Sequence, residues 1–261
     1  MIDKYRLFRQ ASEFTGFHKK LGVIIEPYLN RRWTMADIGC GLALLDFHLL
    51  SNVKSVTAID IDESALTEVE NHIDEELAAN HAEAAKIATL RKDVSELVDE
   101  RWDIVLMSFF GKSPEEIGGI LSRADHRGVV VMHGHERGGL FDPVRFDRPR
   151  ITVDEMERYL SDEGYGYRKS IVDLQFGQPF RTIEDIHRFL GDKIVKGHSV
   201  LPETGEAPDD IGDTETGAGV FDIDRLVYSA EERIIKTKRY DFPYYLPRNL
   251  HTAVFIVVTR R

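Results

Sequence analysis

Cysteine is nearly absent from this chain, since Cys40 is the single one among 261 residues. One thiol can form neither an internal disulfide framework nor a multi-cysteine zinc site. Positive charge is also in deficit, with 34 Lys and Arg against 45 Asp and Glu and a net charge of −11. Nucleic acids and anionic lipids are bound through basic groups, so this balance argues against both as partners, although it leaves room for a local basic patch.

Long apolar runs are lacking as well. The longest, such as residues 253–258, are far too short to cross a bilayer. The first ten residues, MIDKYRLFRQ, lack the apolar stretch of a secretory signal. We therefore expect a cytoplasmic protein with no membrane contact, and the sequence carries no signal for an oligomeric state. The 42% apolar content suffices for a full hydrophobic core.

Strand-like and helix-like segments alternate along most of the chain. Residues 1–33 are expected to be a helical segment, because aromatic and aliphatic residues recur there at spacings of three and four. The segments that favour strands are 34–38, 55–61, 86–90, 102–107, 128–132, 167–174 and 251–259. The helices expected between them are 42–50, one capped by Asp62 or Ser64, 113–122 and 153–163. This alternation predicts an α/β core at 34–175, with a doubly wound, mostly parallel sheet covered on both faces.

The segment 176–250 interrupts the alternation and is interpreted as a helical insertion, after which 251–261 returns to the core. Residues 182–190 and 222–235 have helical patterns. Between them, residues 198–219 contain six acids, no Lys or Arg, four Gly and two Pro. That composition is typical of a mobile loop, and both a disordered excursion and a lid over the site fit it.

A glycine-rich junction, ADIGCGLALL at 36–45, follows the first predicted strand. Gly39 and Gly41 permit a tight turn and close approach of the backbone to a ligand. Asp60 ends the next predicted strand, where a carboxylate can hold both hydroxyls of a ribose. Together these features predict a site for an adenosine-containing cofactor. Leu44 stands where a dinucleotide fingerprint needs a small residue, and no Gly-Lys-Ser/Thr of a P-loop follows.

This junction resembles motif one, with its following acid, of the class I S-adenosylmethionine-dependent methyltransferases. The residues that carry the resemblance are Asp37, Gly39, Gly41 and Asp60, with Ala43 in place of the third glycine. Residues 92–94 (KDV) and 102–105 (WDIV) are similar to the segments after the family's third strand and at its fourth. The resemblance covers about 34–175 and resumes at 251–259. It implies the Rossmann-like methyltransferase fold, with a seven-stranded sheet whose last strand is antiparallel.

The resemblance also implies the cofactor, S-adenosyl-L-methionine, and the residues around it. These are Asp37, Gly39, Cys40, Gly41, Asp60, Ile61, Asp93, Val94 and Ser108. The two glycines and the first aspartate would wrap the amino acid portion, Asp60 would bind the ribose, and Ile61 would pack on the adenine. Simpler roles stay open for some of them. Asp37 can hold the turn by a side-chain hydrogen bond, and Asp62 can bind the ribose in place of Asp60. Asp93 can cap a helix, and Cys40 can serve in packing alone.

The methyl acceptor is marked less clearly. Family members that modify bases or amides often carry Asn/Asp-Pro-Pro-Tyr after the fourth strand, whereas residues 107–111 read MSFFG. We expect in-line methyl transfer to an O, N or S atom of a small molecule, not of nucleic acid. A non-catalytic cofactor-binding or regulatory protein, an aminopropyltransferase and an NAD-dependent oxidoreductase are the alternatives.

Candidate catalytic residues are His133 and His135, which follow the fifth strand at the edge where open α/β sheets bind ligands. One of them would serve as base or substrate contact, unless both face solvent, and no metal site is expected from two histidines. Candidate substrate contacts are Tyr5, Arg145, Tyr240 and Tyr244. Each also has a plainer interpretation as core packing, as part of a solvated basic patch, or as an anchor for the insertion.

Overall fold

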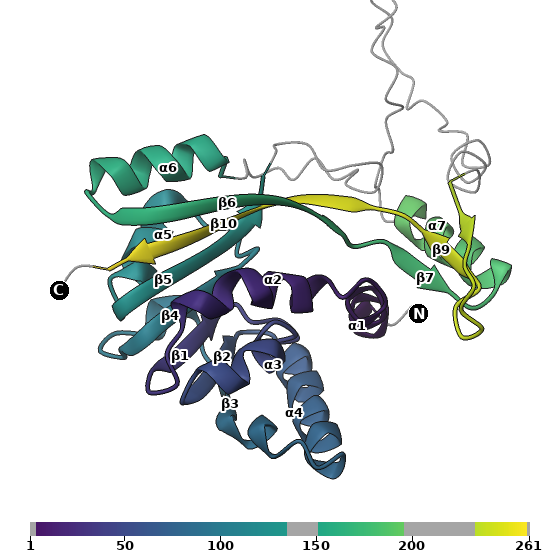
Figure 1. Ribbon diagram of the computed structural model, residues 1–261, viewed down its shortest axis with the longest axis horizontal. Helices are drawn as coiled ribbons and strands as arrows, with labels where there is room; N and C mark the ends of the chain where they lie inside the picture. The colour runs from purple at the N-terminus through teal and green to yellow at the C-terminus, as the bar shows by residue number, and fades with distance from the viewer. Residues whose placement is uncertain (1–3, 135–150, 196–232, 260–261) are drawn as a thin grey trace, which may run out of the picture. The chain divides into compact units, whose positions relative to one another are not determined.

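The computed structural model describes residues 4–134, 151–195 and 233–259 of the chain (Figure 1). These residues divide into two compact units. The larger unit contains residues 4–134, 151–176 and 249–259, and the smaller contains residues 177–195 and 233–248. Among the described helices, none has the length and apolar character needed to span a membrane.

The larger unit is built on a seven-stranded sheet with the order β3-β2-β1-β4-β5-β10-β6. Its strands are β1 (Thr34–Ile38), β2 (Ser55–Asp60), β3 (Ile87–Arg91), β4 (Trp102–Ser108), β5 (Ala124–His133), β6 (Gly166–Gln175) and β10 (Asn249–Val258). Only β10 runs antiparallel to its neighbours, β5 and β6. The expected seven-stranded sheet with an antiparallel last strand is therefore confirmed. The carboxyl ends of β1, β2, β4, β5 and β6 share one edge, called here the carboxyl edge.

Two sets of helices cover the two faces of this sheet. The helices α2 (Phe17–Ile25), α3 (Asp46–Leu49) and α4 (Glu63–Ala78) pack on one face, here the α2 face, where Leu21, Leu49 and Val69 meet strand residues. On the other, the α5 face, lie α5 (Pro114–Leu121) and α6 (Val153–Asp162). Strands buried on both sides explain the continuous apolar runs in the sequence.

Helix ends follow the local sequence signals. Asp62 caps α4 by accepting hydrogen bonds from the backbone N–H groups of Ser64 and Ala65, as predicted. Ser113 caps α5 in a capping box, and Pro114 occupies its first turn, which also agrees with the prediction. The short helices η1 (Glu26–Tyr28), η2 (Leu50–Asn52), η3 (Ala82–Lys86) and η4 (Val94–Glu96) complete the larger unit.

The N-terminal segment forms two helices joined at a glycine. Helix α1 (Lys4–Thr15) ends just before Gly16, whose φ of 64° begins α2. On α1, the Tyr5 hydroxyl donates to the Asp62 carboxylate at 2.6 Å, just beyond the end of β2. The ring of Phe8 lies 5.0 Å from that of Phe176, which follows β6. Helix α1 is thereby attached near the carboxyl ends of two strands from opposite halves of the sheet.

The helix expected at 42–50 is wrong in extent, because α3 covers four residues only. Ala43 has a φ of 50°, a left-handed conformation that a right-handed helix cannot contain. The backbone makes consecutive tight turns instead, with hydrogen bonds from Ala43 to Cys40, from Asp46 to Ala43 and from His48 to Leu45. The apolar spacing of this segment therefore reflects a buried chain of turns.

The smaller unit combines a helix with a small antiparallel sheet of order β7-β9-β8. Its elements are β7 (Gln178–Phe180), α7 (Ile183–Val195), β8 (Ile235–Lys236) and β9 (Tyr244–Leu246). Helix α7 confirms the helical pattern at 182–190. The pattern at 222–235 is contradicted where it is described, because Ile235 is in a strand, and the rest of it lies outside the described residues. The acidic segment 198–219 lies outside them too.

Candidate functional site

The glycine turn lies at the carboxyl edge, folded onto the end of β2. The N–H groups of Gly39 and Cys40 both donate to the carbonyl of Ile59, at 2.8 and 3.0 Å. The next N–H, that of Gly41, donates to the Asp60 carboxylate at 2.8 Å. Three successive amide donors of the turn are therefore committed to β2.

Asp60 is held in place from two sides. One of its carboxylate oxygens accepts from Gly41, and the other accepts from the N–H of Asp62 at 2.9 Å. Since each carboxylate oxygen has two lone pairs, Asp60 keeps the capacity to accept from two further hydroxyls. Asp62 is already engaged with the start of α4 and with Tyr5, so Asp60 is the better placed of the two acids for a ribose. Ile61 beside them is 62% exposed, an apolar surface next to a polar site.

Two further carboxyl groups are buried beneath the turn. Asp37 on β1 is 2% exposed, and Asp46 at the start of α3 is fully buried. Oδ1 of Asp37 and both side-chain oxygens of Asp46 have no hydrogen-bond partner among the described residues. Burial, together with the charge of Asp60, raises the pKa of the Asp37 carboxyl from 3.8 to about 8. Burial and Asp37 raise the pKa of Asp46 well above its usual range.

Cys40 shares this environment. Burial first, and then the charges of the three aspartates, raise the pKa of its thiol far above the ordinary value. A thiol that stays protonated is a poor nucleophile, so packing and backbone geometry remain its role here. Among the described residues no three His, Cys, Asp or Glu side chains are arranged to hold a metal ion.

The two glycines of the turn differ in their surroundings. A Cβ on Gly39 would lie 2.3 Å from the Phe110 ring, whereas nothing lies within 4 Å of one on Gly41. Gly39 thus makes room for Phe110, and the open side of the turn is at Gly41. Both glycines have left-handed φ angles, 72° and 52°, which explains why this position selects glycine.

Asp37, Ser108 and His133 lie at or near the carboxyl ends of three adjacent strands, β1, β4 and β5. The residue before or after each one belongs to the core of the α5 face. Alternation along a strand therefore places these three side chains on the α2 face. The sequence analysis proposed all three, and the structure puts them at one edge and on one side of the sheet.

Phe109 connects this region to the N-terminal helices. Its ring lies 4.8 Å from that of His133 and 6.1 Å from that of Phe17 on α2. Its φ of 53° is unusual for a bulky residue, and such strained conformations concentrate at functional sites. Sequence reasoning noted residues 109 and 110 only as a departure from a motif, and their roles were missed.

Asp93 acts as a cap in the described structure. It accepts from the N–H and hydroxyl of Ser95 and forms a capping box with Glu96 at the start of η4. The N–H of Lys92 donates to the carbonyl of Asp60, which brings this loop beside the end of β2. The role of Asp93 as the cap of η4 is thus established. Contact of Asp93 and Val94 with an adenine stays a prediction.

The candidate substrate residues belong to different parts of the chain. Tyr5 donates to Asp62, which is itself hydrogen-bonded to Asp60. Tyr240 and Tyr244 belong to the smaller unit, where Tyr240 is fully exposed and Tyr244 packs on Phe180 and its neighbours. His135 and Arg145 lie outside the described residues. Tyr5 therefore belongs to the larger unit and Tyr240 and Tyr244 to the smaller one, and the contact of these candidates with a substrate stays a prediction.

No protein-family model matches this chain, and no curated protein matches it in sequence. Solved structures do match. A candidate methyltransferase from Bacillus halodurans has a TM-score of 0.58 at 10% identity, over 93% of this chain and 99% of that one. The YcgJ protein from Bacillus subtilis has a TM-score of 0.55 at 13% identity, over 94% and 99%. A cyclopropane-fatty-acyl-phospholipid synthase-like protein from Lactobacillus casei has a TM-score of 0.51 at 15% identity, over 97% and 92%.

These similarities and the strand order agree on one architecture. The larger unit has the Rossmann-like methyltransferase fold, which confirms the fold that the motif resemblance implied. At such low identities the likeness concerns the fold, and function has to be argued from the site itself.

Proposed function

We propose that this protein transfers a methyl group from S-adenosyl-L-methionine to an O, N or S atom of a small-molecule acceptor by in-line displacement. The fold is one that methyltransferases use, and the glycine turn with Asp60 occupies the carboxyl edge of its sheet, where open α/β sheets bind ligands.

The observation that carries this proposal is that the turn is acidic and offers few donors. Asp37, Asp46 and Asp60 surround it, and the N–H groups of residues 39–41 are bonded to β2. A dinucleotide needs amide donors at a helix N-terminus for its diphosphate. Here α3 begins only at Asp46, and the side chains around the turn are carboxyl groups, which offer a diphosphate no positive charge. A nucleoside that carries positive charge suits this site far better than NAD does.

The residues present fit such a cofactor. The orphaned oxygen of buried Asp37 suits an ammonium group, and Asp60 retains acceptor capacity for ribose hydroxyls. Exposed Ile61 offers an apolar surface for a base. When bound, S-adenosyl-L-methionine supplies an electrophilic methyl group on a sulfonium. Ser108 and His133, on the same side of the sheet, would orient the acceptor or hold its proton.

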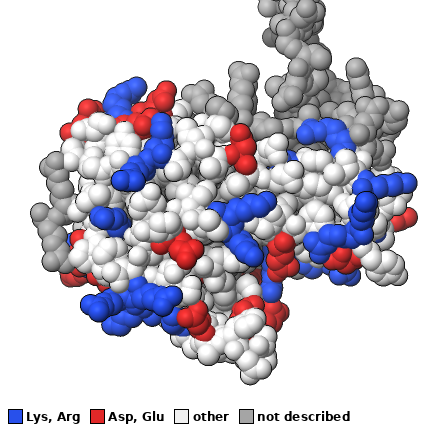
Figure 2. Space-filling view, viewed as in Figure 1, with Lys and Arg blue, Asp and Glu red and all other residues white. Residues whose placement is uncertain are grey.

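A small acceptor is favoured over nucleic acid by charge and by the aromatic surroundings. On the face drawn in Figure 2, Lys and Arg side chains are interspersed with Asp and Glu, and the chain carries a net charge of −11. Binding of a phosphate backbone depends on clustered cations. Phe109 and Phe110 after β4 suit an apolar acceptor instead.

Thermal unfolding with excess S-adenosylhomocysteine, S-adenosylmethionine or NAD tests the cofactor. A ligand at about one hundred times its dissociation constant adds about 2.7 kcal/mol, which raises the midpoint by about 5–10 °C for a chain of this size. We expect that rise with the first two ligands and not with NAD. Asp60→Asn should reduce it, whereas Asp103→Asn, at the opposite edge of the sheet, should leave it intact. A rise with NAD alone would contradict the proposal.

Release of S-adenosylhomocysteine with a panel of phenols, carboxylic acids, amines and thiols then tests transfer. Product with one acceptor class would assign the accepting atom. Cofactor binding without product from any acceptor would favour the non-catalytic binding protein.

A further inference from the structure

A histidine and an aspartate are paired at the carboxyl edge, apart from the cofactor residues. His251 near the start of β10 and Asp173 near the end of β6 are direct partners in the register of these antiparallel strands. Nδ1 of His251 lies 2.6 Å from a carboxylate oxygen of Asp173. The next residue of β10, Thr252, is the partner of His133 on β5. The pair therefore reaches the same edge of the sheet as the proposed site.

The pair lies on the opposite face of the sheet from His133. Leu250 and Val254 belong to the core of the α2 face and Ala253 to that of the α5 face, so alternation along β10 places His251 on the α5 face. Strand β10 is two strands from β4, which is about 10 Å at ordinary strand spacing. Side chains from β4 and β10 can therefore meet at one atom of an acceptor that lies over the end of β5.

The end of β5 makes room for the histidine ring. The N–H of Gly134, which follows this strand, donates to the carbonyl of His251 at 2.7 Å. A Cβ on Gly134 would lie 2.3 Å from Cδ2 of His251 and 3.2 Å from Nε2. The imidazole thus lies against the backbone beside the end of β5, and a larger residue at this position would displace it.

The hydrogen bond with Asp173 determines which nitrogen of the ring can act as a base. An ionised carboxylate only accepts hydrogen bonds, so Nδ1 of His251 donates and carries the proton of the neutral ring. The lone pair is then on Nε2, the nitrogen close to Gly134. The carboxylate also stabilises the imidazolium that forms when Nε2 takes up a proton. The His251 side chain is 26% exposed, so it is neither buried in the core nor fully in solvent.

We propose that His251 is the general base of the methyl transfer and that the acceptor is a phenolic hydroxyl. Asp173 is a positioning residue, since it acts through His251. This inference rests on the proposed function, because it needs a methyl donor at the glycine turn. A thiol ionises readily, a carboxylic acid is ionised already, and an amine attacks through a lone pair that needs no proton transfer during the attack. A phenol keeps its proton at neutral pH, so it gains most from a base.

The bonds and charges of this step balance. As the acceptor oxygen forms its bond to the methyl carbon, its proton passes to Nε2 of His251 and the electron pair of the O–H bond stays on oxygen. The carbon–sulfur bond breaks with its electron pair on sulfur, so the sulfonium becomes a neutral thioether. The imidazolium pairs with Asp173 and then gives its proton to solvent. The products are a methyl ether, S-adenosylhomocysteine and one proton.

The rate should depend on the protonation of His251. Among the described residues, the titratable side chains next to it in the strand register are Asp173 on β6 and His133 on β5. The ring of His133 lies against that of Phe109 on the α2 face. A histidine loses its proton between about pH 5 and about pH 8, so kcat should rise over this range. Substitution of each histidine separately shows which of the two causes the rise.

Methyl transfer from S-adenosylmethionine to a panel of phenols, with amines and thiols alongside, tests the inference. We expect product with a phenol. His251→Gln should lower kcat by about 10²–10⁴-fold and abolish its rise with pH. Asp173→Asn should also lower kcat, because the ring loses the group that orients it. The matched control is His81→Gln, since Nδ1 of His81 also lies 2.6 Å from a carboxylate, that of Glu76, and this variant should keep the wild-type kcat.

A binding measurement tests the proton transfer without turnover. In this experiment 4-nitrophenol, whose phenolate absorbs visible light, is added in mildly acidic buffer to the protein saturated with S-adenosylhomocysteine. We expect the phenolate band to grow with the wild type and with His81→Gln, and not with His251→Gln. The measurement on the wild type keeps the test valid if His251→Gln fails to fold, because absence of the band there would contradict the inference.

The outcomes separate this inference from the proposed function. Absence of S-adenosylhomocysteine binding would overturn both. Binding together with methyl transfer to amines or thiols and none to phenols would overturn the inference alone, as would a wild-type kcat for His251→Gln. A pH dependence that disappears in His133→Gln instead would assign the base to His133. If His251→Gln also lost its thermal stabilisation by S-adenosylhomocysteine, its role would be structural and the inference would be wrong.

Discussion

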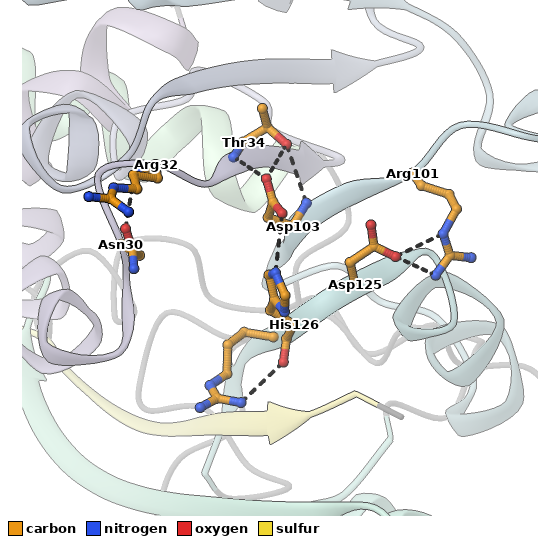
Figure 3. Close-up of polar contacts among 8 residues, drawn as sticks. Asn30, Arg32, Thr34, Arg101, Asp103, Asp125 and His126 are labelled. Carbon is orange, nitrogen blue, oxygen red and sulfur yellow. Dashed lines mark hydrogen bonds and ion pairs between the residues drawn. The ribbon is translucent and has the colours of Figure 1, made fainter. Parts of the chain in front are cut away.

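The carboxyl groups near the two ends of strand β1 differ in their hydrogen bonding. At its start, Asp103 of β4 accepts hydrogen bonds from the backbone N–H and hydroxyl of Thr34, at 2.8 and 3.0 Å. His126 lies 3.4 Å from the same side chain (Figure 3). The His126 ring is also stacked on that of Trp33. Near the other end of β1, Asp37 has an oxygen with no hydrogen-bond partner in the described part of the chain.

This contrast distinguishes a carboxyl group that stabilises the fold from one that is available to a ligand. A carboxylate surrounded by donors stabilises the native state and specifies how neighbouring strands meet. A buried carboxyl without donors costs stability and is retained where another molecule supplies the missing partner. The polar groups at the amino edge are therefore satisfied within the protein, and under the proposed function we expect the carboxyl edge to bind the ligand.

The largest effect expected from this contrast is on affinity. Asp37→Ala should weaken binding of S-adenosylhomocysteine by about 2–5 kcal/mol, because it removes the charged partner of a buried ammonium. Titration calorimetry at pH 8 measures this loss. Asp103→Ala should bind as the wild type does, and equal losses in both variants would remove the distinction between the two edges.

The next effect concerns the turn itself. Gly39→Ala should destabilise the protein by about 2–3 kcal/mol, since a left-handed alanine costs about 1–2 kcal/mol and the new methyl must also displace Phe110. Gly41→Ala, which has the same strain but open space, should cost only about 1–2 kcal/mol. Urea unfolding compares them. A larger loss for the alanine at 41 would mean that Phe110 does not restrict the turn.

At the amino edge we expect a cost in stability alone. Asp103→Ala should lower the free energy of unfolding by about 1–3 kcal/mol, because it leaves the Thr34 N–H and hydroxyl without their acceptor. Denaturant unfolding measures it. The neighbouring ion pair of Arg101 with Asp125 is more exposed, so Arg101→Ala provides a weaker control of the same edge. A negligible loss for Asp103→Ala would show that this edge tolerates an unsatisfied backbone donor.

The smallest expected effect is a gain in stability, whereas the preceding substitutions reduce affinity or stability. Asp37 titrates at about 8 when folded and near 3.8 when unfolded, so the folded protein holds a proton that the unfolded chain has released. Its contribution to stability is complete below pH 4 and is lost as the pH rises to about 8. Burial raises the pKa of Asp46 as well, so Asp46 loses stability with rising pH in the same direction. Asp46→Asn removes that second loss and should stabilise the protein by about 1 kcal/mol at pH 8 and less at pH 5.

The difference between Asp46→Asn and the wild type is the quantity to follow. His18, bonded to Ser12 and buried among aromatic rings, has its pKa lowered to about 3, and this favours folding at higher pH. Its contribution cancels in the comparison of the two proteins. Thermal unfolding at pH 5 and pH 8 supplies the numbers, and a variant that is less stable at pH 8 would contradict the expected sign.

Most of the fold could be predicted from the spacing of apolar residues in the sequence. All seven segments predicted as core strands are strands. The central ones, such as β4 and β5, are apolar runs because helices cover both faces of the sheet there. The strands of the smaller sheet were missed. They are two or three residues long, and β7 pairs with β9 across more than sixty residues of sequence, so no local pattern encodes them.

The site was predictable where a backbone requirement marks it. Gly39 and Gly41 need left-handed angles, and Asp60 ends a strand whose neighbour carries the turn. Asp46 was not predictable, because an aspartate within an apolar run has no distinctive spacing. Its burial results from the turns that replace the expected helix, which in turn depend on the conformation of Ala43.

Ala43 has a consequence for how relatives of this chain can be found. It stands where the related motif has its third glycine, and its φ of 50° shows that the glycine-like torsion has been kept although the letter has changed. A search pattern that demands glycine there will discard such a chain. A pattern defined by backbone torsion angles would retain it. Such a pattern would group sequences in which the residue types of the turn have changed and its backbone conformation has not.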